Sequence, residues 1–281
     1  MTEILINELS LSGQFSSADE FISGGSLLKF NALLNEIKSP NVLLYKSHGF
    51  YESMVTKDIS IYSLLVGTIS RQYDEIRKMK SGLACLFEDP YWENEQKHSS
   101  EFSYFFNKDC VTGKSLAEAC ERDRVVISFF HQNFSCNRLF VQKEETEIAL
   151  DNLFKEKDYI DVAWKRSFIA CEEYCIKKFK STKLDFSKMD TDEGFSLLKK
   201  EDEDLFIDGF RKFTELTWPQ INVDDALDFK EYKDNKGYFK SYKKKIHKFR
   251  ISRKYRCFGY VEQGIFFVLL FDLTHKLSDF G

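Results

Sequence analysis

The feature that most constrains the fold is the stretch 246–272, where three β-prone runs follow one another with short connections. The first two runs are rich in β-branched and aromatic residues, and the third, 265–271, is apolar throughout. A Glu-Gln-Gly sequence at 262–264 separates the last two runs, as a hairpin turn does. Connections this short leave no room for a crossover helix, so the stretch predicts an antiparallel three-stranded meander. Because apolar residues occupy both alternations of 265–271, we expect that strand to be central and covered on both faces.

The composition indicates an ordered protein of more than one domain. At 281 residues the chain exceeds a typical single domain. Its 28 Phe against 3 Pro argue against a chain dominated by disordered linkers. It contains no apolar run long enough to span a membrane and no basic, signal-like start, so we expect a cytosolic (cytoplasmic) protein with no membrane partner. Its seven scattered cysteines fit reduced thiols better than a disulfide framework.

The N-terminal half of the chain alternates strand-like and helix-like segments. They occur at 3–11 (strand), 17–37 (helix), 41–45 (strand), 59–79 (helix) and 113–130 (helix, then strand). A short apolar piece at 83–92 lies between the last two. This alternation predicts an α/β domain over residues 1–143, with a small parallel or mixed sheet and no role evident from the sequence.

The following region, from residue 144 to residue 216, has the spacing of amphipathic helices. Apolar residues recur at helical intervals over 144–179 and again over 195–216, where the acidic cluster 201–204 lies on the outer side. The second predicted domain, 144–281, is therefore a helical segment followed by the meander. The fold class predicted for the whole chain is α+β.

Two features of the N-terminal half resemble sites of other chemistry. The Gly-Lys-Ser sequence at 113–115 ends like a P-loop, but position 108 is Lys where that motif needs glycine, so we assign its serine to a helix start. Three carboxylates near predicted strand ends could gather around a metal ion in an α/β nuclease, although no spacing holds them together. They are Glu8, Asp58 and Asp123.

The net charge of −4 hides a strong asymmetry. Residues 229–256 contain twelve Lys or Arg against two Asp or Glu, a balance of +10 that leaves −14 for the rest of the chain. Aromatic residues are interleaved with the basic ones, a mixture that suits a nucleic acid because ammonium groups bind phosphates and rings stack on bases. A solvated lysine face is the alternative. The candidate nucleic-acid-binding residues are Lys240, Lys243, Lys244, Lys245, Lys248 and Lys254.

Residues 246–275 carry an ordered set of short motifs. They are Phe-Arg-Ile at 249–251, a tight turn, Tyr-Arg at 255–256, the hairpin, the apolar run and a final histidine, His275. In this order of elements the segment resembles the RelE/ParE toxin superfamily. Helices ahead of a meander also suit that family, so the resemblance implies a RelE-like module at the C-terminal end of the sequence.

The resemblance implies cleavage of RNA without a metal ion or other cofactor. In that reaction the 2′-hydroxyl of the RNA attacks the adjacent phosphorus, so the site needs cations to balance the phosphorane charge and a proton donor for the leaving oxygen. Arg250, Arg253 and Arg256 are the implied cations, because guanidinium binds phosphate oxygens bidentately. His275 is the implied proton donor. The residues alone also allow another interpretation. In it the arginines occupy outward-facing strand positions and His275 only closes the fold.

The leading hypothesis is a toxin or antiphage-defence effector that acts as an endoribonuclease on mRNA at the ribosome. Its expected partners are RNA, the ribosome and an antitoxin or other protein. An alternative hypothesis keeps the RelE-like fold as a catalytically inactive module that binds nucleic acid or protein, and the lack of a tyrosine after His275 favours it. The metal-dependent nuclease built on the N-terminal carboxylates is the second alternative.

Overall fold

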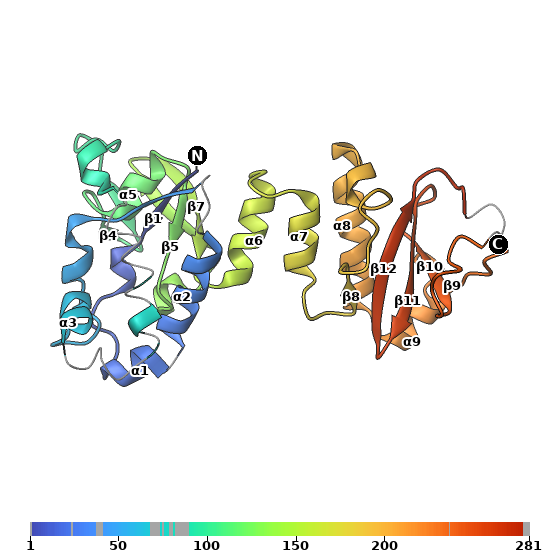
Figure 1. Ribbon diagram of the computed structural model, residues 1–281. Helices are drawn as coiled ribbons and strands as arrows, with labels where there is room; N and C mark the ends of the chain where they lie inside the picture. Colours follow the sequence, from blue (N-terminus) through green and yellow to red (C-terminus); the bar gives the residue numbers. More distant parts are fainter. Residues whose placement is uncertain are drawn as a thin grey trace. The chain divides into compact units, whose positions relative to one another are not determined.

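Seven strands form a mixed sheet in the N-terminal unit, residues 1–165, one of the two units into which the chain divides (Figure 1). The computed structural model describes residues 2–23, 25–37, 42–67, 74, 76–78, 81, 90–235 and 237–277. The strand order is β2-β1-β5-β7-β6-β3-β4. The bounds are β1 (Thr2–Ile6), β2 (Val42–Tyr45), β3 (Tyr104–Phe106), β4 (Asp109–Cys110), β5 (Val125–Ile127), β6 (Arg138–Lys143) and β7 (Thr146–Leu153).

The first four strands of this order run parallel, and the last three extend the sheet antiparallel. β1 pairs parallel with β2 and β5, and β5 pairs parallel with β7, whereas β6 pairs antiparallel with β7. Residues 4–6 and 125–127 are fully buried, as expected of parallel strands that are covered on both faces. The predicted mixed sheet of the N-terminal region is therefore confirmed.

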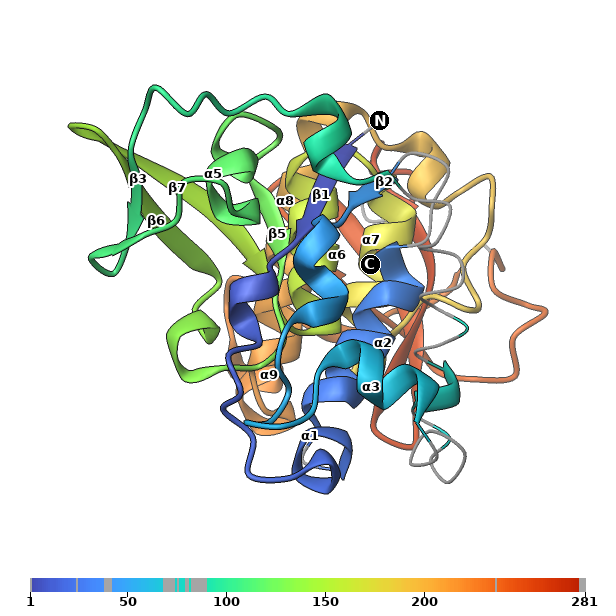
Figure 2. The same ribbon diagram turned by 90° about the vertical axis from the view of Figure 1, so that its left-hand side faces the viewer.

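Helices cover both faces of this sheet. On one face, α5 (Ser115–Cys120) packs with Leu5 and Val126 in one apolar cluster. On the other face, α2 (Ser26–Ile37) packs with α1 (Ala18–Ser23) and α6 (Glu156–Lys165), and the ring of Phe30 stacks on Phe129 just after β5. Figure 2 shows α1 and α3 (Ile61–Val66) beyond the carboxyl end of β1. The strand ends of the parallel part therefore lie close to loops.

The region 144–154 is mostly a strand, and the helical structure predicted for it is wrong. Exposed and buried residues alternate over 147–150 with the period of two that a strand requires. The same apolar positions also fit helical spacing, and the hydrogen bonds of β7 to β5 and β6 decide between the two. Because β6 pairs with β7, the N-terminal unit continues to residue 165, past the boundary predicted at residue 143.

The other N-terminal helices lie close to their predicted positions. The helix expected over 17–37 forms as α1 and α2, and the Ser17 Oγ accepts a hydrogen bond from the Glu20 backbone N at 3.1 Å. The helix expected over 59–79 begins as α3. Much of its continuation, and the 83–89 part of the apolar piece, lie outside the described residues. Within the described ranges, no helix combines the length and the apolar character that crossing a membrane requires.

A five-stranded sheet in the order β8-β12-β11-β10-β9 forms the C-terminal unit, residues 166–281. Its strands are β8 (Leu184–Asp185), β9 (Lys230–Glu231), β10 (Ile246–Arg250), β11 (Arg256–Glu262) and β12 (Ile265–Asp272). The last three form the predicted antiparallel meander. β12 also pairs in parallel with β8, so it is an internal strand as predicted. The helices are α7 (Cys171–Lys178), α8 (Lys200–Glu215) and α9 (Trp218–Val223).

Aromatic side chains cover both faces of the C-terminal sheet. On one face, rings of α8 contact rings of the strands, namely Phe206, Phe210 and Phe213 against Phe249, Phe266 and Phe271. On the other face, Tyr232 and Phe239 pack against Phe258 in a second apolar cluster. The expectation that 265–271 is covered on both faces is confirmed, and the charged groups of the meander that reach solvent lie at its two ends.

Candidate functional site

All four predicted catalytic residues lie at one end of the C-terminal sheet, which we call the arginine end. β10 ends with Arg250 and β11 begins with Arg256, and these two residues are partners in the strand register. Arg256 is also the register partner of Asp272, the last residue of β12. Arg253 lies in the connection between β10 and β11, and His275 follows β12 by three residues. The meander therefore gathers three guanidinium groups, a carboxylate and an imidazole.

Arg256 closes the connection between β10 and β11. Its Nη1 donates to backbone carbonyl oxygens of that connection, at 3.1 Å to Ser252, 3.2 Å to Arg253 and 3.3 Å to Tyr255. The side chains of Arg253 and Lys254 in the same connection are exposed. The half-buried Arg256 guanidinium thus fixes the loop that presents two cations to solvent.

Arg250 is held by the segment that precedes β9. Its Nη2 donates to Asp228 Oδ2 at 3.0 Å, and its Nη1 donates to the Asp225 carbonyl oxygen at 3.3 Å. Its Nε is buried and has no hydrogen-bond partner among the described residues. The Nε–H of this guanidinium is therefore a buried donor without a partner in the described part of the chain.

Asp272 organises the turn that carries His275. Its buried carboxylate accepts hydrogen bonds from the backbone N of Thr274 at 3.3 Å, Lys276 at 3.0 Å and Leu277 at 3.1 Å. Within this turn His275 has a φ of 60°, a left-handed conformation that a non-glycine residue keeps only where its surroundings impose it. Its side chain is partly exposed. Asp272 therefore sets the position of the candidate proton donor.

Lys248 does not lie on the surface with the other predicted lysines. It is only 4% exposed, and its Nζ lies 5.5 Å from the ring centroid of Tyr232. Burial, together with the charges of Lys230 and Arg256, lowers the pKa of Lys248. This burial contradicts the predicted contact of Lys248 with a nucleic acid. Strand alternation places Lys248 on the face of the sheet that Tyr232 and Phe239 cover.

The exposed lysine run lies at the opposite end of the sheet. It consists of Lys240, Lys243, Lys244 and Lys245. Lys244 pairs with Glu262, the last residue of β11, and Lys245 Nζ lies 3.1 Å from Glu231 of β9. Since the arginine end holds the first residue of the seven-residue β11, about 20 Å separates it from Glu262. Apart from the buried Lys248, the predicted site residues therefore lie at the two ends of the sheet, with Lys254 at the arginine end.

The three carboxylates predicted as a metal site are not brought together. Glu8 follows the end of β1, whereas Asp123 accepts a hydrogen bond of 2.8 Å from the backbone N of Glu3, near the start of the same strand. Asp58 lies in the loop before α3. Among the described residues, no three His, Cys, Asp or Glu side chains are grouped so that they could hold a metal ion. The geometry gives no support to the metal-dependent nuclease.

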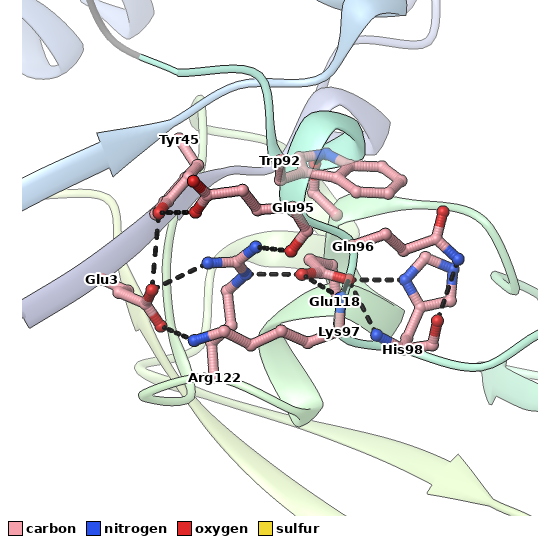
Figure 3. A network of polar contacts seen from close by, with 10 residues as sticks. Glu3, Tyr45, Trp92, Glu95, Gln96, Lys97, His98, Glu118 and Arg122 are labelled. Carbon is pink, nitrogen blue, oxygen red and sulfur yellow. Dashed lines mark hydrogen bonds and ion pairs between the residues drawn. The ribbon is translucent and has the colours of Figure 1, made fainter.

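A buried polar network in the N-terminal unit was not evident from the sequence (Figure 3). Glu118 of α5 is fully buried, and its carboxylate accepts hydrogen bonds of 3.0 Å from the backbone N of Lys97 and of His98. His98 Nδ1 lies 2.6 Å from the same carboxylate, and Arg122 Nε donates to it at 2.5 Å. Burial by itself raises the pKa of Glu118, but the hydrogen bonds outweigh burial and lower it.

Arg122 links this network to the sheet. Its Nη1 donates to Glu3 Oε1 at 2.8 Å, and its Nη2 donates to the Glu95 carbonyl oxygen at 2.7 Å. The guanidinium carbon of Arg122 lies 4.2 Å from the ring centroid of Tyr45 (Figure 3). Within the described part of the chain, no buried side-chain nitrogen or oxygen of this network lacks a hydrogen-bond partner. A polar network satisfied in this way stabilises the fold. The i,i+4 spacing of Glu118 and Arg122 is its main sequence signal.

The arginine end has the groups that phosphate chemistry requires. Guanidinium binds phosphate oxygens and stabilises negative charge that develops on them, and an imidazole can act as a general acid. Comparison of the chain with protein-family models, with curated proteins and with solved structures found no match. The function is therefore argued from the geometry of the arginine end and from the motifs in the sequence.

Proposed function

We propose that the C-terminal unit binds RNA and cleaves it without a metal ion, in keeping with its resemblance to the RelE/ParE toxins. The observation that carries the proposal is the gathering of Arg250, Arg253, Arg256 and His275 at one end of the sheet. The placement of the motifs supports it, since Phe-Arg-Ile falls across the end of β10 and Tyr-Arg across the start of β11. The proposed setting is a toxin or defence effector that acts on mRNA at the ribosome and is neutralised by a partner protein.

In the proposed mechanism the RNA supplies its own nucleophile. The 2′-oxygen attacks the adjacent phosphorus and loses its proton to water, while the bond from phosphorus to the 5′-oxygen breaks. The products carry a 2′,3′-cyclic phosphate and a 5′-hydroxyl. Arg253 and Arg256 balance the charge that builds up on the phosphorane oxygens, and His275 protonates the leaving 5′-oxygen. Arg250, which Asp228 holds at the end of β10, adds positive charge beside the phosphate.

A second candidate function is binding without cleavage. Arg250 and Arg256 already donate to protein acceptors, and arginines used in this way hold a fold as readily as they hold a substrate. The exposed side chains of Arg253 and Lys254 would then bind a nucleic acid or an acidic protein surface. The two functions differ in one observable respect, because only the first forms a product.

RNA cleavage by the purified full chain in the presence of EDTA tests the proposal. We expect cleavage to persist in EDTA, and we expect Arg256→Ala to lower the rate at least about a hundredfold, the scale for losing one transition-state donor. Arg253→Ala removes one cation but keeps the backbone carbonyl groups to which Arg256 donates. Its cleavage rate therefore measures the effect of losing that charge. Lys243→Ala, at the opposite end of the sheet, is the matched control and should cleave saturating RNA at the parent rate.

Folding of the variants has to be measured beside the rate. Arg256→Ala removes the hydrogen bonds that close the β10–β11 connection, so circular dichroism and thermal unfolding accompany its assay. If folded Arg253→Ala and Arg256→Ala proteins cleave RNA as fast as the parent, the ribonuclease proposal fails. If the parent binds RNA and forms no product, the second candidate function replaces the first.

A further inference from the structure

A pocket of about 420 Å³ opens in the N-terminal unit where the parallel strands end. Its polar lining residues include Glu8, Ser12, Ser47, Glu52, Glu93 and Lys114. The chain passes from β1 to β2 through α1 and α2 on one face of the sheet, and it reaches β5 through α5 on the other face. Open α/β sheets bind ligands outside the carboxyl ends of strands, at the place where connections leave to opposite faces. The pocket lies beyond the carboxyl ends of β1 and β2 and beside the start of α5, and it has the volume of a small-molecule site.

Two nearly buried side chains line this pocket with atoms that lack hydrogen-bond partners. Glu8 is 8% exposed, and its Oε1 accepts a hydrogen bond of 3.0 Å from the backbone N of Ser115. Its Oε2 has no partner among the described residues. Ser47 is 5% exposed, and its Oγ has no partner in the described part of the chain either. Buried polar atoms are almost always paired, so two unpaired ones on one pocket indicate a group that binds there.

The balance of charge favours a positively charged group. Glu93 Oε1 accepts a hydrogen bond of 2.8 Å from the backbone N of His48, and Glu93 Oε2 lies 3.7 Å from His48 Nδ1. Three glutamates line the pocket against one lysine, Lys114. Burial raises the pKa of Glu8, so a cation that enters the pocket would stabilise its ionised form.

We propose that this pocket binds a small organic cation, an amine or guanidinium compound, whose N–H groups donate to Glu8 Oε2 and Ser47 Oγ, while Glu52 and Glu93 add negative charge to the lining. An ammonium group has three donors, enough for both acceptors. A metal ion fits less well, because the described side chains provide no group of three metal ligands. The site uses no residue of the arginine end and goes beyond the proposed RNA chemistry.

Isothermal titration calorimetry of the full chain with agmatine and with 1,4-diaminobutane tests this site. The neutral 1,4-butanediol, which has the same chain length, is the control compound. We expect saturable binding of both cations and none of the diol. Glu93→Gln keeps an acceptor for the His48 backbone N but removes one negative charge from the pocket lining, and it should weaken binding of the cations at least about tenfold. Glu147→Gln makes the same charge change at an exposed position of β7 and should bind as the parent does.

Glu8→Gln tests the more deeply buried carboxyl group. Glutamine keeps an acceptor for the Ser115 backbone N, and circular dichroism shows whether this variant folds. If Glu8→Gln does not fold, Glu93→Gln and Ser47→Ala decide the result. The proposal is overturned if neither cation binds at millimolar concentration, or if the folded pocket variants bind as tightly as the parent. RNA cleavage by Glu93→Gln should equal that of the parent, so failure of this site is distinguishable from failure of the proposed function.

Discussion

Glu118→Gln should destabilise the N-terminal unit by about 3 kcal/mol, the lower end of the cost of removing one partner of a buried ion pair. The side chains of Glu118 and Arg122 are both fully buried. Glutamine keeps one oxygen for the backbone donors of the network but presents an NH₂ group where Arg122 Nε needs an acceptor. The lower end of the range applies because Arg122 keeps its ion pair with Glu3 at 2.8 Å.

Thermal unfolding and amide hydrogen exchange measure this cost. For a unit of this size, one kcal/mol corresponds to about 2–4 °C, so Glu118→Gln should lower Tm by about 6–12 °C. The backbone amides of Lys97 and His98, which donate to Glu118, should exchange faster in the variant. Glu147→Gln, at an exposed position of the same unit, is the matched control and should change stability by less than about 0.5 kcal/mol.

The effect of Glu118→Gln should also depend on pH. Folding lowers the pKa of Glu118 below the usual value of 4.5, so its ionised form contributes stability that is fully present above pH 4.5. That contribution is lost as the pH falls through the lower pKa of the folded protein. The difference in stability between the parent and Glu118→Gln should therefore shrink on acidification below pH 4.5. Equal Tm values for Glu118→Gln and Glu147→Gln at neutral pH would show that the buried ion pair of Glu118 and Arg122 adds no stability.

Three further outcomes are expected in the C-terminal unit. Gly259→Ala should destabilise this unit by about 3 kcal/mol in urea unfolding. A Cβ at this position would lie 2.1 Å from the Phe267 carbonyl oxygen and 2.7 Å from the Phe266 ring. Unchanged stability would contradict this close packing. His275→Asn should lower the cleavage rate by about 10²–10⁴-fold and flatten its pH profile. Asparagine is chosen because it tolerates the left-handed backbone of this position. A pH profile like that of the parent would exclude proton donation by His275. Lys243→Ala should reduce the salt slope of RNA binding by about one in titrations at several salt concentrations, and an unchanged slope would remove this lysine from the interface.

The parts of the fold that follow from local pattern could be predicted from the sequence. The meander is fixed by connections too short for a crossover and by the apolar run 265–271. The strand β7 could not be assigned in the same way, because its apolar positions satisfy helical and strand spacing alike and its pairing with β5 decides the outcome. Local periodicity therefore predicts the secondary structure where short connections limit the possible arrangements. It fails where pairing with a distant strand decides between helix and strand.

The candidate sites depend on contacts that the sequence does not display. Lys248 lies in a run of exposed lysines, yet Tyr232 and Phe239, from a preceding segment, cover the strand face on which it lies. Glu3 and Arg122 are far apart in the chain and meet only because β1 packs against α5. The unpaired oxygen of Glu8 likewise results from tertiary packing. The motifs place Arg250, Arg256 and His275 on or just after successive strands of the meander, and the register of β10, β11 and β12 brings these positions to one end of the sheet.

The most direct test of the central claim is cleavage of an RNA in which a single nucleotide at the cut site is replaced by its 2′-deoxy form. The assay uses the full chain in EDTA and determines the chemical groups at the new ends. The proposed mechanism gives 2′,3′-cyclic phosphate and 5′-hydroxyl ends on the all-ribose RNA, and no cut at the 2′-deoxy position, because the attacking oxygen is missing there. Cleavage at the 2′-deoxy position, or products with 5′-phosphate ends, would contradict it.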